Sequence, residues 1–131
     1  MATQAEGTFQ LSSFDENTYD EFGKAKLTRA TIVQEFSGDL RATGTCETLM
    51  CYAEDGTATF VGLQRMVGTL GGRSGSFVVQ ANGGYDGGAA RTMWTVVPGS
   101  GTDGLRDLHG EGSSVAPGGP GGSYTLEYTL A

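Results

Sequence analysis

The chain has 131 residues, 23 of them glycine, and a formal net charge of −7. The length suits one domain. The glycines follow no three-residue period, which excludes a collagen-like chain, and the acidic surface argues against a nucleic-acid or anionic-membrane partner. No stretch of eighteen apolar residues predicts a transmembrane helix.

Runs rich in β-branched and aromatic residues, bounded by Gly, Asp or Ser, predict strands along most of the chain. The acidic segment FDENTYDEFG (14–23) is predicted as a surface loop. The glycine-heavy segment 98–122 has at most a short strand near 106–113, and SSVAPGGPGG at its end reads as a flexible loop. The remaining strands are expected near 5–14, 25–37, 40–53, 57–70, 74–83, 89–98 and 122–130.

Seven or eight sequential antiparallel strands can close into an up-and-down barrel, which removes exposed sheet edges. We therefore expect an all-β fold, a single eight-stranded antiparallel barrel formed by one domain over residues 1–131. A β-sandwich is the alternative. A barrel of eight strands is about wide enough to hold one small ligand.

Two-residue turns at Gly38-Asp39, Asp55-Gly56, Gly71-Gly72 and Asp86-Gly87 predict the strand register. They place Gln64 opposite Glu47 and Val79, and Ala81 opposite Thr92. Because cross-strand partners share a face, one face becomes the predicted interior. It comprises Ala30, Glu47, Leu49, Cys51, Phe60, Gly62, Gln64, Met66, Phe77, Val79, Ala81, Thr92, Trp94 and Val96.

The opposite face includes Thr48 and Met50 and carries an apolar strip in which Arg65 and Arg91 are set. An exposed strip of this kind marks a partner surface, so we expect either a homo-oligomer or coverage by loops or the N-terminal segment. The strip consists of Val61, Leu63, Val67, Val78 and Met93.

Glu47 is the one carboxylate on the predicted interior face, next to Gln64. Burial raises a carboxyl pKa toward neutrality, which suits a general acid or base, and Gln64 could hold that carboxylate or a ligand. The competing interpretation puts Glu47 at a barrel mouth or in an ion pair. The predicted ligand wall comprises Trp94, Phe60, Phe77, Met66, Cys51, Val79, Ala81 and Thr92, and a plain packed core is its alternative.

Other chemistry finds less support in the sequence. Cys46 and Cys51 lie on one strand about 16 Å apart and point to opposite faces, so no disulfide is expected. Reduced thiols and the lack of a leader indicate the cytoplasm. Cys46 is interpreted as a packing residue and His109, the only histidine, as a surface residue. One His and two separated Cys cannot build a zinc site, and we expect no metal and no cofactor.

Three segments, KLTRATIVQEFSGDL, FVGLQRMVGTLGGRSGSFVVQ and VVPGSGTDGLRDLHGEG, resemble a family of small bacterial proteins known only as a domain of unknown function. That family is assigned to the allene oxide cyclase-like barrels, and the likeness covers nearly the whole chain. It implies an eight-stranded barrel with a mostly apolar cavity, but no activity. The family pattern has Glu where this chain has Gln64 and His where it has Ala81, so a Glu/His pair is lost here or moved.

Two functions follow from these expectations. The first is a cofactor-independent isomerase or cyclase that moulds a hydrophobic substrate, with Glu47 moving a proton. The second is a carrier or binding module for a small apolar molecule. Both require a cavity inside the barrel, and a solid interior would exclude both.

Overall fold

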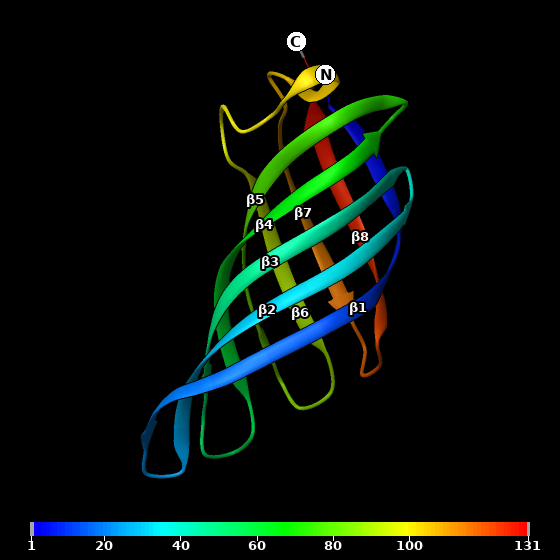
Figure 1. Cartoon of the computed structure of the whole chain (residues 1–131). Helices are drawn as coiled ribbons and strands as arrows, with labels where there is room; N and C mark the ends of the chain where they lie inside the picture. Colours follow the sequence, from blue (N-terminus) through cyan, green and yellow to red (C-terminus); the bar gives the residue numbers. More distant parts are fainter. Residues whose placement is uncertain (1, 131) are drawn as a thin grey trace.

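The computed structural model describes residues 2–130 and confirms an all-β closed barrel of eight antiparallel strands, each paired with its neighbours in sequence (Figure 1). The first and last strands close the barrel, from Thr3 opposite Tyr128 to Gln10 opposite Gly121. The strands are β1 (Thr3–Phe22), β2 (Ala25–Gly38), β3 (Leu40–Tyr52), β4 (Ala58–Leu70), β5 (Arg73–Tyr85), β6 (Ala90–Val96), β7 (His109–Ala116) and β8 (Gly121–Thr129).

Two segments differ from the sequence prediction. Residues 14–22 are not a loop but the second half of β1, which stays paired with β2 as far as Phe22 opposite Ala25. The pairing of β1 with β2 contains two register shifts, one just before this half, between Leu11 and Ser13, and one within it, between Thr18 and Asp20. The resulting hairpin extends beyond the other hairpins at its end of the barrel (Figure 1). The short strand expected near 106–113 is β7, which begins and ends three residues later.

The predicted register is correct between β4 and β5 and wrong between β3 and β4. Gln64 lies opposite Val79, as the Gly71-Gly72 turn requires. On β3, however, Gln64 faces Cys46, and Glu47 faces Leu63. This slip of one residue turns every β3 side chain to the other face. Ala81 faces Trp94 rather than Thr92, a slip of two residues that leaves the faces unchanged.

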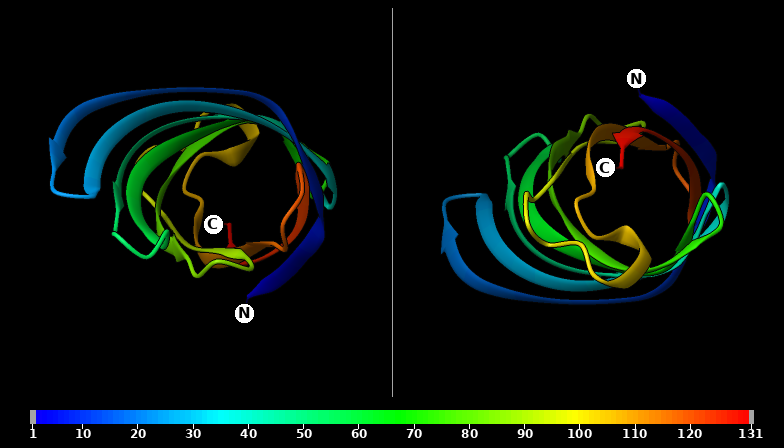
Figure 2. Two further views of the ribbon diagram at one scale, coloured as in Figure 1. Left: turned by 90° about the horizontal axis from the view of Figure 1, so that it is seen from below. Right: turned by 90° about the horizontal axis from the view of Figure 1, so that it is seen from above.

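One end of the barrel is filled by the β6–β7 connection. This connection contains the short 3₁₀ helix η1 (Asp103–Leu105) and crosses the barrel end (Figure 2). Leu105 and Leu108 are each 1% exposed and belong to the main core. The hydroxyls of Ser100 and Thr102 accept hydrogen bonds from the backbone N–H groups of Val78 and Ser76, respectively. These bonds hold the connection against β5.

An aromatic cluster lies on the inner face next to this filled end. The Trp94 ring stacks on the Tyr124 ring with centroids 5.9 Å apart, and Phe36 packs edge-on against both. The Tyr124 hydroxyl accepts the Leu40 N–H at 2.9 Å and donates to the Ser37 carbonyl at 2.8 Å. This half of the interior is packed, and any open space must lie toward the other end.

Candidate functional site

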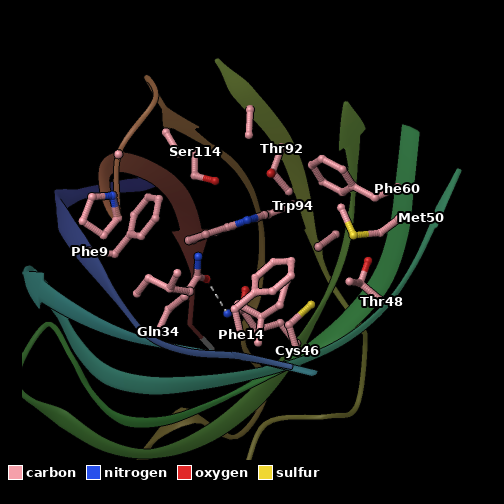
Figure 3. Close-up of a pocket in the computed structure, with 18 residues that line it drawn as sticks. Phe9, Phe14, Gln34, Cys46, Thr48, Met50, Phe60, Thr92, Trp94 and Ser114 are labelled. Atoms are coloured by element: carbon pink, nitrogen blue, oxygen red, sulfur yellow. Dashed lines mark hydrogen bonds between the residues drawn. The ribbon is translucent and has the colours of Figure 1, made fainter. Parts of the chain in front are cut away.

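A cavity of about 200 Å³ lies inside the barrel, between the aromatic cluster and the end formed by the β1–β2 hairpin and the β7–β8 turn (Figure 3). Half-exposed Phe14 and the turn residues Gly119 and Pro120 are part of its lining. Nothing that lines it is an Asp, Glu, Lys, Arg or His. The lining residues are Phe9, Leu11, Phe14, Ile32, Gln34, Cys46, Thr48, Met50, Phe60, Gln64, Ala81, Ala90, Thr92, Trp94, Ser114, Ala116, Gly119 and Pro120.

Cross-strand pairs build the walls. One wall comes from β6 and β7, where Thr92 lies opposite Ser114 and brings two hydroxyl side chains together. The facing wall comes from β2, β3 and β4, where Cys46 lies between Ile32 and Gln64. Such a mostly apolar wall with a few placed polar groups is typical of a small-molecule site.

The facing wall carries two amide side chains, Gln64 and Gln34, besides the hydroxyl of Thr48. Gln64 is 3% exposed, and its Nε2 donates to Oε1 of Gln34 at 2.9 Å. This is the hydrogen bond drawn between lining residues in Figure 3. The sequence predicts an inward position for Gln64, and Gln34 was not among the predicted site residues. Gln34 lies two residues from both Ile32 and Phe36 on β2, so all three side chains share one face of the strand. This spacing is the signal that could have identified Gln34.

Cys46 places a thiol in the same wall. Burial, together with the nearby Glu47 charge, raises the pKa of Cys46 to about 11. The cavity therefore presents a neutral thiol at pH 7 rather than a thiolate, and the thiolate is the nucleophilic form. Cys46 thus contributes a small, weakly polar surface.

The structure corrects the placement of Glu47 and Cys51. Glu47 is exposed on the outer face of β3, where its carboxylate accepts a hydrogen bond from Thr31 at 2.6 Å. Cys51 has the same outward parity and does not line the cavity. The physical reason is the slip at the Asp55-Gly56 turn, which instead brings Cys46, Thr48 and Met50 inside.

The other predicted site residues divide into two groups. Gln64, Trp94, Phe60, Ala81 and Thr92 do line the cavity. In contrast, Met66, Phe77 and Val79 face inward but lie in the packed half of the core, each at most 1% exposed. The packed-core interpretation is therefore right for part of the predicted wall, and the cavity interpretation for the rest.

A carboxylate that the sequence analysis missed lies on the inner face of the β1–β2 hairpin. Oε2 of Glu16 accepts hydrogen bonds from the hydroxyls of Thr28 and Tyr52, both at 2.6 Å. Burial and this carboxylate raise the pKa of Tyr52 to about 12. Glu16 does not line the cavity, and its contacts fasten the hairpin to β3.

The outer face of β3 to β6 carries the predicted apolar strip. Leu63 is 53% exposed and Met93 is 61% exposed, while Val78 is half-buried. Leu49, which the register slip moves outward, extends the strip beside Val61. Residues 2–130 leave these side chains exposed and do not cover them, and self-association through the strip stays a prediction.

Among residues 2–130, no group of three or more His, Cys, Asp and Glu side chains is arranged to hold a metal ion. Over the same residues, no helix is both long and apolar enough to span a membrane. His109 is exposed at the start of β7.

Comparison with known proteins agrees with the barrel. A crystal structure of a protein of unknown function from the DUF3224 family of Shewanella oneidensis MR-1 is similar over 100% of this chain and 99% of its own, with a TM-score of 0.79 and 26% identity. No curated protein matches the chain. The family model described as "Protein of unknown function (DUF3224)" matches residues 5–128. The chain therefore belongs to the DUF3224 family.

Proposed function

We propose that this protein binds a small, largely apolar molecule in the barrel cavity. The observation that carries the proposal is the cavity of about 200 Å³ with mainly apolar walls. An apolar cavity of about 150 Å³ is known to hold benzene, so a ligand of about ten non-hydrogen atoms suits this one. We expect a ligand to enter beside Phe14, the lining residue whose side chain is 45% exposed.

Isomerase or cyclase activity would be a more specific function than binding. It is supported by the likeness to allene oxide cyclase-like barrels. Its acid–base component required Glu47 inside the cavity, and that carboxylate lies outside. What is left is a cavity that could mould a flexible substrate by its shape. We therefore place binding first, with turnover as the alternative. The two separated free cysteines favour a reducing compartment such as the cytoplasm.

Tryptophan fluorescence can be used to measure ligand binding. Trp94 is the only tryptophan and lines the cavity, so a bound ligand changes its fluorescence. Burying about 200 Å² of apolar surface contributes about 5 kcal/mol, which corresponds to a dissociation constant of about 0.2 mM. A titration of the full chain with toluene, excited at the tryptophan band, should saturate in that range.

Native mass spectrometry of the purified protein identifies any ligand that remains bound. Incubating the identified ligand with the protein and analysing the products then separates a carrier from an enzyme. If the Trp94 signal does not respond to toluene or to any compound of similar size, the binding proposal is wrong.

A further inference from the structure

Two glutamine side chains meet in the cavity wall, at positions where a barrel interior ordinarily places apolar side chains. Gln64 is 3% exposed and donates to Gln34 through a 2.9 Å hydrogen bond. Burying an amide is unfavourable unless its polar atoms find partners. One hydrogen bond between two amides satisfies only part of each group. The rest of their hydrogen-bonding capacity needs another partner.

The unused atoms form a defined pair. Whichever amide donates, a single hydrogen bond between them leaves one carbonyl oxygen and one NH₂ group. Within residues 2–130 no buried side-chain nitrogen or oxygen lacks a partner. The atoms left over by the hydrogen bond from Nε2 of Gln64 to Oε1 of Gln34 are therefore not sealed in the core, and both side chains line the cavity. We infer that the Gln64 carbonyl oxygen and the Gln34 NH₂ group are available to a ligand at the cavity wall.

Gly44 provides the room for this arrangement. A Cβ on Gly44 would lie 2.6 Å from Nε2 of Gln64 and 2.8 Å from the Phe36 ring. Those distances are shorter than real contacts, so any larger residue would displace the Gln64 amide. Gly44 on β3 therefore leaves the space that the Gln64 amide fills together with the Phe36 ring and the Met66 sulfur, which would lie 2.9 Å from that Cβ.

The surroundings of the pair carry no charge. The lining contains no Asp, Glu, Lys, Arg or His, and the molecule as a whole has a net charge of −7. An ionised ligand would lose its hydration here without gaining a counter-ion. A neutral ligand keeps its apolar contacts and can still use the donor and acceptor.

We propose that the Gln34–Gln64 pair recognises a neutral ligand with an adjacent donor and acceptor, such as a carboxamide or lactam attached to an apolar body. The ligand's carbonyl accepts from the free NH₂ group, and its N–H donates to the free carbonyl oxygen. This inference rests on the proposed binding function and names the class of ligand that the cavity prefers.

The test uses three compounds of similar size and the full chain. Benzamide carries the donor and acceptor, benzoate is its charged isostere, and toluene has only the apolar body. Isothermal titration at pH 7 should show benzamide binding at least about tenfold tighter than benzoate. Gln64→Met should weaken benzamide about tenfold relative to toluene, since it removes the hydrogen bonds at similar volume.

Gln80→Met is the matched control, because Gln80 is exposed on the outer face of the adjacent strand β5. It should change none of the three affinities. Gln34→Met removes the other amide and gives the same comparison if Gln64→Met does not fold. The ratio of benzamide to benzoate binding in the unaltered protein needs no variant at all.

The outcomes separate the two proposals. Failure of both toluene and benzamide to bind overturns the binding function itself. Toluene binding with benzamide no tighter than benzoate overturns the inference about the amide pair and leaves the binding function intact. An unchanged ratio of benzamide to toluene affinity in the folded Gln64→Met or Gln34→Met variant does the same.

Discussion

Replacing Ala81 with leucine tests whether the cavity is empty space. Ala81 is 5% exposed, lines the cavity and lies opposite Gly62 and Trp94 on the neighbouring strands. Ala81→Leu adds three carbon atoms, which contribute about 2.4 kcal/mol at about 0.8 kcal/mol each when they fill existing space. Ordering the side chain costs about 0.5–1 kcal/mol. The net expectation is a stabilisation of about 1.5 kcal/mol.

Thermal unfolding measures this change. At about 2.1 cal/mol/K per residue, a chain of this length has an unfolding entropy of about 0.27 kcal/mol/K, so the Tm should rise by about 5 °C. Overpacking a solid core costs about 1–3 kcal/mol instead, which lowers the Tm by about 4–11 °C. The sign of the shift therefore decides the question. Toluene binding should be weakened or abolished in the same variant.

Ala5→Leu is the matched control. Ala5 is 1% exposed and belongs to the packed core, opposite Leu126 on β8, and it does not line the cavity. The same three carbon atoms there should lower the Tm. If Ala81→Leu lowers the Tm as much as Ala5→Leu does, the cavity is not available space and the reasoning fails.

Three further predictions concern a thiol, a phenol and the outer face. In a Cys51→Ser background, Cys46 should react slowly with iodoacetamide at pH 8 and faster as the pH approaches 11, because its raised pKa keeps it neutral; rapid reaction at pH 8 contradicts this. The raised pKa of Tyr52 stabilises the fold fully below pH 10, and this contribution is lost as the pH rises through about 12. Circular dichroism should therefore show a smaller loss of stability over that range in Tyr52→Phe, and an equal loss would refute the contribution. Sedimentation of the wild type and of Leu63→Lys tests self-association through the apolar strip; a monomeric wild type removes that prediction.

The strand register could be predicted where the turn residues allow only one turn conformation. Gly71 and Gly72 both have positive φ, 57° and 84°, as a two-residue hairpin turn requires. The β4–β5 register was therefore correct, and with it the inward direction of Gln64 and Ala81. At Asp86-Gly87 the slip of two residues preserved the faces, because side chains alternate with a period of two.

The wrong orientation of the β3 side chains traces to one turn. The Asp55 side chain accepts hydrogen bonds from the backbone N–H and hydroxyl of Thr57, and the Ala53 N–H donates to the Thr57 carbonyl. This makes a longer loop than the two-residue turn that Asp-Gly suggests. Aspartate supports either conformation, so the dipeptide could not choose between them. The difference of one residue moved Glu47 out of the predicted site.

The predicted register between β2 and β3 is also wrong by one residue, and this second error compensates for the first one on β2. The Gly38-Asp39 turn is also displaced by one residue, since Ala30 lies opposite Thr48 rather than Glu47. The two errors cancel, and β2 faces the predicted way. Glu16 was missed for a different reason, because a run of acidic residues looks like a solvated loop when its pairing with β2 is unknown.

The closure of the barrel by β1 and β8 has a consequence for how the protein folds. Thr3 pairs with Tyr128, so the contacts that seal the sheet join residues at opposite ends of the sequence. Such long-range contacts form slowly, because the intervening chain must first be ordered. The cavity draws on β1 as well as on the β7–β8 turn, and it exists only after this seam has closed. The ability to bind a ligand should therefore appear in the last step of refolding, together with the final environment of Trp94.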